Sequence, residues 1–279
     1  MKALDKYREI FLILKSKDFD FPEKQAEEIL SYVLKIKKSQ LYTINPEITK
    51  EEEKLINSII QRRLNNEPLQ YIFGECEFYG LRIKVGPGVL IPRPETEILV
   101  EEVLKRKEDI LNIDIKILDL CTGSGCIALV IAKNIENSEV YGVDISKKAI
   151  LYAMENKRIN SIKNAHFLVS DLFSSIKSRF AAITANPPYI KSSEISHLHP
   201  EVKYYEPYQA LDGGKDGLDF YRKIIKEAKN YMYESGFLFI ELGMGQADQV
   251  RKIAKNCGFR ILEVVKDLAN IDRVMILKK

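Results

Sequence analysis

The residues best placed to do chemistry in this sequence are Asn186-Pro187-Pro188-Tyr189, which follow the apolar run at 181–185. Two consecutive prolines fix two φ angles and remove two backbone donors, so a strand has to end there. The Asn186 side-chain oxygen and a main-chain carbonyl of the Pro187-Pro188 step can accept the hydrogens of a planar –NH2 group and orient its lone pair toward an electrophile. Tyr189 offers a flat face for stacking. The motif predicts a site that acts on an amide or amino nitrogen, without a general base if the electrophile is a sulfonium methyl.

A second candidate site lies at the glycine-rich turn at 121–125, directly after the apolar run KILDL. Gly123 and Gly125 let the backbone approach a ligand closely at the start of the next helix. Asp144 stands roughly 20 residues further on, where a carboxylate can bind the hydroxyls of a ribose. The spacing predicts an adenosine-like ligand and leaves open whether it is a dinucleotide or an adenosyl compound.

The order of the elements must bring these two sites together. Strand-like and helix-like segments alternate from about residue 93, which indicates an α/β fold with a parallel sheet covered by helices on both faces. In such a sheet the fourth strand emerges beside the first, so Asn186 should face Gly123 and Gly125. The expected strands are 116–120, 139–144, 165–171, 181–186, 236–243, 259–267 and 273–279, and the expected helices lie near 125–134, 146–160, 216–233 and 245–257.

Residues 1–75 have helical periodicity, with Thr49 and Glu52 forming a capping box at the start of one helix. We expect a small helical bundle in this region. Aromatic residues separated by glycines then predict a β-hairpin linker at 76–92. The helical region carries none of the candidate site residues, and it is the natural candidate for recognising a large substrate.

Several segments resemble a known family. The segments DLCTGSG (119–125), VDIS (143–146) and NPPYI (186–190) resemble amino-methyltransferases of the Rossmann-like class that use S-adenosylmethionine. Longer segments are similar to the protein-(glutamine-N5) methyltransferases of peptide chain release factors: PLQYIFGECEFYG (68–80), VLIPRPETE (89–97), YEPYQALDGGKDGLDFYRKII (205–225) and KDLANIDRV (266–274). The resemblance covers about residues 60 to 279, and the helical N-terminal region fits it by position more than by sequence.

The resemblance implies a class I methyltransferase domain at 93–279, with a seven-stranded mixed sheet whose last strand is antiparallel. It also implies transfer of a methyl group from S-adenosyl-L-methionine to the glutamine of the Gly-Gly-Gln motif of release factors, with S-adenosyl-L-homocysteine as the second product. The residues that would bind the cofactor are Cys121, Thr122, Gly123, Ser124, Gly125, Asp144, Asp171, Leu172 and Asn186. The glutamine would bind to Asn186, Pro187, Pro188 and Tyr189, with Asn186, Pro187 and Tyr189 taking part in catalysis, and Arg93 and Glu95 would line the rim.

This chain departs from the family at three positions. Cys121 stands where Gly is usual, so we expect that its backbone does not need a positive φ. Leu172 replaces an aromatic residue found in some relatives, which makes the expected contact with adenine apolar rather than stacked. Asn270 stands where Gly is common, and Asn is the next best residue for a left-handed turn.

Parts of the sequence are also compatible with three other functions. A glutamine methyltransferase of a ribosomal protein, and a nucleic-acid adenine-N6 methyltransferase, present the same planar nitrogen, but a net charge of +3 without a basic stripe does not favour nucleic acid. An adenosyl-compound sensor would not need Asn186-Pro187-Pro188-Tyr189. Possible metal-binding groups, His197 with His199 and the aspartates of 212–219, lack further ligands at the required spacing, so no metal is expected.

The cysteine content and the hydrophobicity of the chain indicate in which compartment of the cell the protein is expected. Four cysteines without a Cys-x-x-Cys pair are typical of reduced thiols. The chain shows no pattern of a signal peptide or of a segment that crosses a membrane. We therefore expect a cytoplasmic protein without a membrane partner. We also expect a monomer, and the resemblance implies that its substrates are proteins.

Overall fold

The computed structural model describes residues 1–279, and the chain divides into two compact units. The first unit comprises Met1–Gly74 and Pro200–Tyr205, and the second comprises Glu75–His199 and Glu206–Lys279. No helix is both long enough and apolar enough to span a membrane.

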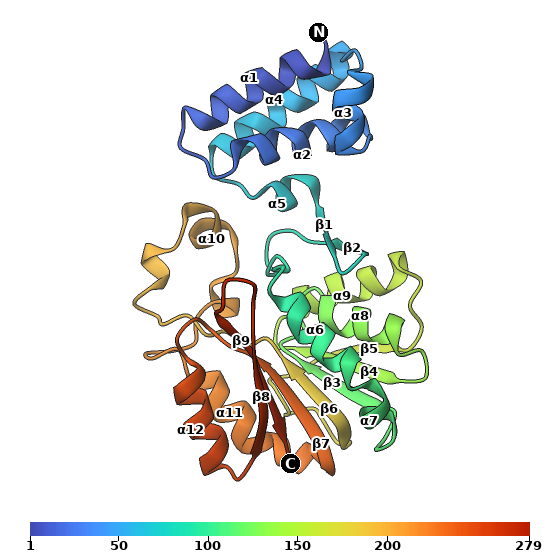
Figure 1. Cartoon of the computed structure of the whole chain (residues 1–279), viewed down its shortest axis with the longest axis vertical. Coiled ribbons are helices and arrows are strands. Elements are labelled where there is room, and N and C mark those ends of the chain that lie inside the picture. The colour runs from blue at the N-terminus through green and yellow to red at the C-terminus, as the bar shows by residue number, and fades with distance from the viewer. The chain divides into compact units, whose positions relative to one another are not determined.

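The first unit is helical (Figure 1). Apolar residues of its N-terminal helices meet in a core that includes Ile10, Leu30 and Ile56. The predicted capping box is confirmed, because the Glu52 N–H donates to the Thr49 hydroxyl and the Glu52 carboxylate accepts from the Thr49 N–H. The helices are α1 (Ala3–Lys15), α2 (Pro22–Leu34), α3 (Lys38–Ile44), α4 (Lys50–Leu64), α5 (Leu69–Phe73) and α10 (Pro200–Tyr205).

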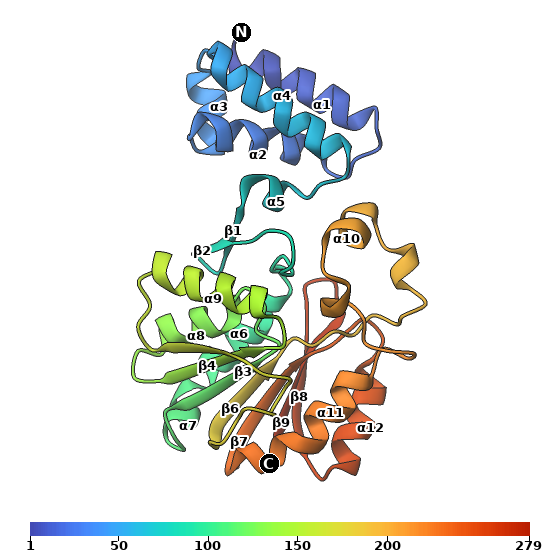
Figure 2. The ribbon, with the colours of Figure 1, turned by 180° about the vertical axis from the view of Figure 1, so that it is seen from behind.

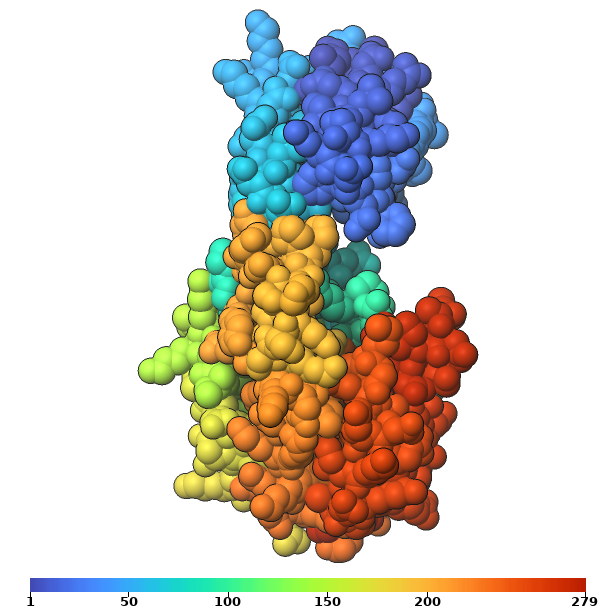
Figure 3. All heavy atoms as spheres, turned by 90° about the vertical axis from the view of Figure 1, so that its left-hand side faces the viewer, coloured from blue at the N-terminus to red at the C-terminus, as the bar shows by residue number.

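Helix α10 joins this unit although it comes from a distant part of the sequence. The buried guanidinium of Arg63 forms an ion pair with Glu201 at 2.8 Å, and the Tyr205 hydroxyl donates to the Asn65 carbonyl at 2.8 Å. Figure 3 shows the gold atoms of this segment against the cyan atoms that follow α4. From the sequence, residues 200–205 were assigned to the methyltransferase region 93–279. The sequence does not show that Arg63 is buried or that Glu201 is its partner.

The second unit begins with a β-hairpin whose strands end at Lys84, so the hairpin is shorter than the predicted range 76–92. Tyr71 and Phe73 lie in α5, and the two strands are β1 (Glu75–Phe78) and β2 (Leu81–Lys84). Tyr79 and Gly80 form the turn with φ angles of 48° and 72°, the double left-handed turn that matches the twist of a two-residue hairpin.

The second unit is built on a seven-stranded sheet with the order β5-β4-β3-β6-β7-β9-β8. The pairs from β5 to β7 are parallel, while β9 is antiparallel to both β7 and β8. This confirms the predicted mixed sheet with an antiparallel last strand. The strands are β3 (Lys116–Leu120), β4 (Glu139–Asp144), β5 (Ala165–Val169), β6 (Phe180–Ala185), β7 (Met232–Glu241), β8 (Arg260–Lys266) and β9 (Asp272–Lys278).

Helices cover both faces of this sheet (Figures 1 and 2). On one face lie α6, α8 and α9, and on the other α11 and α12 pack against each other. Central strand β6 is buried along its whole length, as two covered faces require. The helices are α6 (Thr96–Lys105), α7 (Lys107–Leu111), α8 (Cys126–Asn134), α9 (Lys147–Ile159), α11 (Asp219–Ala228) and α12 (Ala247–Asn256), with 3₁₀ turns at Ile195–His197, Tyr208–Ala210 and Lys229–Tyr231.

Candidate active site

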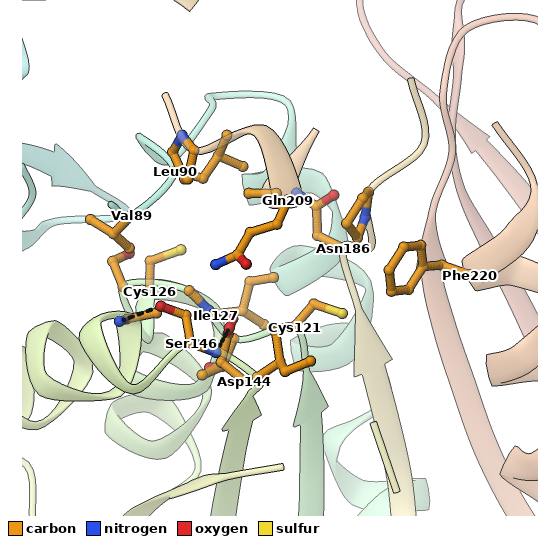
Figure 4. A pocket seen from close by; sticks show the side chains of 18 of the residues that line it. Val89, Leu90, Cys121, Cys126, Ile127, Asp144, Ser146, Asn186, Gln209 and Phe220 are labelled. Carbon is orange, nitrogen blue, oxygen red and sulfur yellow. Dashed lines mark hydrogen bonds between the residues drawn. The ribbon is translucent and has the colours of Figure 1, made fainter. Parts of the chain in front are cut away.

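A cavity of about 280 Å³ opens at the carboxyl ends of β3, β4 and β6 (Figure 4). Strand β6 pairs directly with β3, as predicted, so the segment after Ala185 comes out beside the turn that follows Leu120. Figure 4 shows Asn186 and Phe220 on one side of the cavity and Val89 and Leu90 on the opposite side. The structure therefore brings the two predicted sites into one pocket.

The turn after β3 needs left-handed backbone at three positions, with φ of 55° at Cys121, 54° at Gly123 and 80° at Gly125. The expectation that Cys121 avoids a positive φ is wrong. The Thr122 N–H donates to the Val143 carbonyl at 2.9 Å, and this bond between neighbouring strand ends fixes the turn at Cys121. A Cβ at Gly125 would lie 2.9 Å from the Ala153 methyl carbon, so only glycine fits there.

Asp144 is the last residue of β4, and its carboxylate stabilises the turn at 121–125. Its Oδ2 accepts from the Gly123 N–H and its Oδ1 from the Ser146 N–H, both at 2.9 Å. Burial raises the pKa of Asp144, and these two hydrogen bonds oppose that rise. Each carboxylate oxygen can accept a second hydrogen bond, so Asp144 keeps acceptors for two hydroxyl groups of a ligand.

Asp171 and Leu172 line the same cavity, next to the turn after β5. Leu172 has a φ of 46°, a strained value for a leucine, and the Ser170 hydroxyl donates to its carbonyl at 2.8 Å. The fixed turn presents an apolar side chain to the pocket, in keeping with the expected contact that is apolar rather than stacked.

Asn186 has a defined orientation. Its Nδ2 donates to the Thr96 hydroxyl at 3.1 Å, which leaves its Oδ1 as the group available to accept hydrogens in the cavity. Pro188 also lines the cavity, whereas Pro187 and Tyr189 do not. The Tyr189 hydroxyl instead donates to the Glu241 Oε1 at 3.4 Å, and burial raises its pKa.

The backbone of this motif is held from behind by Gln246, which sequence reasoning missed. The Gln246 Nε2 donates to the Tyr189 carbonyl at 2.9 Å and to the Gly217 carbonyl at 3.3 Å, and its Oε1 accepts from the buried Tyr221 hydroxyl at 3.2 Å. A Cβ at Gly217 would lie 2.5 Å from the Tyr189 carbonyl oxygen. In the sequence, the glycines of the segment LDGGKDGLD (211–219) indicate that another stretch of backbone lies close to this loop.

The rim residues differ in position. Arg93 lines the cavity and forms an ion pair with the buried Glu206 at 2.5 Å, while Glu95 precedes α6 and lies outside the lining. Other lining residues had no assigned role in the sequence: Val89, Leu90, Thr96, Ile127, Gln209, Phe220 and Lys223.

Beneath the pocket, Asp119 on β3 is fully buried. It accepts hydrogen bonds from the hydroxyls of Thr122 at 2.5 Å and Thr184 at 2.7 Å. Burial raises its pKa to about 7, although these hydrogen bonds lower it. The side chain thus links the glycine-rich turn to strand β6.

This shift predicts a pH-dependent contribution to stability. The folded pKa lies above the unfolded value, so this contribution is complete below about pH 4 and is lost as the pH rises to about 7. Asp119→Asn should remove that share of the pH dependence, on the order of a few kcal/mol. Urea unfolding between about pH 4 and 8 measures it, and an unchanged slope in the variant would contradict the assignment.

Residues 6–74 match the family described as PrmC N-terminal domain, and residues 94–199 match the family described as Methyltransferase small domain. The release factor glutamine methyltransferase of Thermodesulfovibrio yellowstonii is 60% identical, covering 100% of this chain and 99% of that protein. The one of Fusobacterium nucleatum is 42% identical, covering 99% of this chain and 78% of that protein. A solved methyltransferase from Pyrococcus furiosus shares the fold, with a TM-score of 0.51 at 18% identity over 72% of this chain and 90% of that one.

Proposed function

The chain belongs to the release factor glutamine methyltransferase family, and from that premise we propose that it methylates the side-chain nitrogen N5 of the glutamine in the Gly-Gly-Gln motif of peptide chain release factors. It is a protein-glutamine methyltransferase, as both curated relatives indicate. The observation that carries the finer proposal is the orientation of Asn186, whose Oδ1 is free to accept while its Nδ2 is held by Thr96.

The residues of the pocket fit S-adenosyl-L-methionine. At Gly123, which lines the cavity, the absence of a side chain lets a ligand approach the backbone of the turn closely. Asp144 retains acceptors for ribose hydroxyls, and Leu172 offers an apolar contact to an adenine beside Asp171. When bound, the cofactor supplies an electrophilic sulfonium methyl group.

The chain's own part in the reaction is to orient the amide of the substrate. An amide nitrogen is a weak nucleophile because its lone pair is delocalised into the carbonyl. The Asn186 Oδ1 and a carbonyl of the Pro187-Pro188 step accept its two hydrogens, so the lone pair is directed out of the amide plane and toward the methyl group. Tyr189 and the prolines keep these acceptors in place. The glutamine nitrogen gains the methyl group, whose bond to the cofactor sulfur breaks, and it releases one of its two amide hydrogens as a proton to solvent.

Selection of a release factor requires contacts beyond one glutamine side chain. We assign this role to the helical region 1–75, followed by the hairpin linker 76–92 and the methyltransferase region 93–279. Release factors are then the protein partners, met in the cytoplasm by a monomeric enzyme, with no nucleic acid or membrane involved.

Methyl transfer from labelled S-adenosyl-L-methionine to three substrates tests this function. Purified release factor should be labelled, while ribosomes and DNA should not. Label in a ribosomal protein would favour a different glutamine substrate, and label in DNA would favour an adenine-N6 methyltransferase. If a ribosomal protein or DNA is labelled and release factor is not, the proposal is wrong.

A further inference from the structure

Gln246 is a buried side chain whose hydrogen bonds reach the substrate motif, and the reaction described above gives it no role. It directly precedes α12, is 9% exposed and does not line the cavity. Its Nε2 donates to the Tyr189 carbonyl at 2.9 Å and to the Gly217 carbonyl at 3.3 Å. Its Oε1 accepts at 3.2 Å from the hydroxyl of Tyr221, a fully buried side chain. Both ends of the Gln246 amide are therefore hydrogen-bonded inside the protein.

These partners decide which way the Gln246 amide faces. A main-chain carbonyl can only accept hydrogen bonds, whereas the NH2 group of a glutamine can only donate and carries two hydrogens. The carbonyls of Tyr189 and Gly217 therefore take one hydrogen each. A flipped amide would place its oxygen against both carbonyl oxygens, so only one orientation satisfies the two carbonyls.

Two glycines leave the space that these bonds need. A Cβ at Gly217 would lie 2.7 Å from the Gln246 Nε2 and 2.5 Å from the Tyr189 carbonyl oxygen. A Cβ at Gly243 would overlap with the Gln246 Oε1 and lie 2.9 Å from the Cδ2 atom of the Tyr189 ring. The loop before α11 and the segment after β7 both lack a side chain at the place where the glutamine lies. The fold is thus fitted around this one side chain.

The Pro187-Pro188 step lies between two fixed points of the backbone. On one side, Asn186 directly follows β6, which is paired with a strand on each edge. On the other side, Gln246 holds the Tyr189 carbonyl. The two proline rings fix the φ angles at 187 and 188. Few torsions between the two points remain free, so the direction of the intervening carbonyls depends on the bond from Gln246.

We propose that Gln246 is a positioning residue, which acts through the Tyr189 carbonyl to fix the main-chain carbonyl that accepts a hydrogen of the substrate amide. This inference rests on the proposed methylation of a glutamine amide, in which a carbonyl of the Pro187-Pro188 step is one of the two acceptors. Tyr221 supports Gln246 by donating to its Oε1. Gln246 itself does not line the cavity, so it acts without touching the substrate or the cofactor.

The first test replaces Gln246 by an apolar side chain of similar length. Gln246→Met removes all three hydrogen bonds, and we expect kcat on intact release factor to fall roughly tenfold or more, because a small displacement of an orienting group is costly in rate. The KM for release factor and the affinity for cofactor should change little. Gln249→Met makes the same change at an exposed position of α12 and should keep the kcat of wild type. A kcat of Gln246→Met close to that of Gln249→Met would overturn the proposal.

A second variant tests the same chain of bonds with a smaller change. Tyr221→Phe keeps the buried ring and removes the hydroxyl that binds the Gln246 Oε1, so kcat should fall less than in Gln246→Met. In the Gln246→Met background, Tyr221→Phe should add little further loss, because the two residues act in one chain. Calorimetric titration with cofactor counts the folded sites, and kcat is expressed per folded site. Losses that vanish on this scale, or that simply add in the double variant, would overturn the proposal.

A readout without turnover keeps this inference distinct from the proposed function. The sequence contains two Tyr-Ile pairs, Tyr71-Ile72 and Tyr189-Ile190, so protein labelled with ¹³C at tyrosine carbonyls and ¹⁵N in isoleucine gives two HNCO resonances. Gln246→Met should shift the Tyr189 carbonyl resonance and leave that of Tyr71 in place. If wild type fails to methylate release factor, the proposed function fails, and the shift still decides whether Gln246 holds the motif. A Tyr189 resonance that does not move would overturn the inference.

Discussion

We expect Asn186→Ala to lower the rate of methyl transfer about a hundredfold or more, because the variant loses the acceptor that orients the target nitrogen. The substitution should destabilise the fold only slightly. Asn186 follows β6 rather than lying within it, and its side chain donates a hydrogen bond to the Thr96 hydroxyl at 3.1 Å. Single-turnover transfer at saturating cofactor measures the effect without a contribution from product release.

Asn186→Asp is the matched variant for this prediction. Aspartate keeps an acceptor at the same position but, when ionised, cannot donate to Thr96. We expect a loss smaller than that of Asn186→Ala, with a thermal midpoint near that of wild type for both. A rate for Asn186→Ala close to wild type would remove Asn186 from the chemistry.

We expect Asp144→Ala to weaken S-adenosyl-L-methionine binding roughly tenfold to a hundredfold, since charge-assisted hydrogen bonds to ribose hydroxyls contribute about 1.5–3 kcal/mol. The variant also frees the N–H groups of Gly123 and Ser146, which Asp144 binds at 2.9 Å. Burial already disfavours the charge of Asp144, as its raised pKa shows, so the loss of stability without ligand should be the smaller effect.

Titration calorimetry on folded protein measures this affinity, and Asp144→Asn serves as the control. Asparagine can still accept one of the two backbone hydrogen bonds, so it should preserve the turn better than alanine while losing the charge. An unchanged cofactor affinity in both variants would exclude Asp144 from the ribose site.

The parts of this protein that follow from short-range patterns could be predicted from its sequence. The alternation of strands and helices predicted the sheet, and the pairing of β6 with β3 brought Asn186 beside the turn at 121–125. The left-handed conformation of Asn270, with a φ of 63°, was also expected, because a glycine is common there in the family.

The features that escaped prediction depend on contacts between distant residues. Cys121 adopts a φ of 55° because a bond from Thr122 to the end of β4 fixes the turn, and no local pattern reports that bond. Gln246 lies 57 positions from the Tyr189 carbonyl that it binds. A buried glutamine or glutamate has no periodicity that would distinguish it from a surface residue, and only the folded chain shows what it contacts.

The short helices α3 and α5 were missed for a different reason. Each has at most seven residues, too few for a helical period to stand out, and α5 carries aromatic residues that favour strands. In the structure their buried side chains, Leu41, Leu69 and Ile72, join the core of the first unit, so tertiary packing rather than local preference decides their conformation.

The central claim is that this enzyme transfers one methyl group to one glutamine nitrogen of a release factor. Mass spectrometry of intact release factor after reaction with wild-type enzyme and S-adenosyl-L-methionine tests it most directly. We predict a single added methyl group on the glutamine of the Gly-Gly-Gln motif, and no modification when that glutamine is replaced by alanine. A methyl group on any other residue, or continued methylation of the alanine variant, would contradict the account.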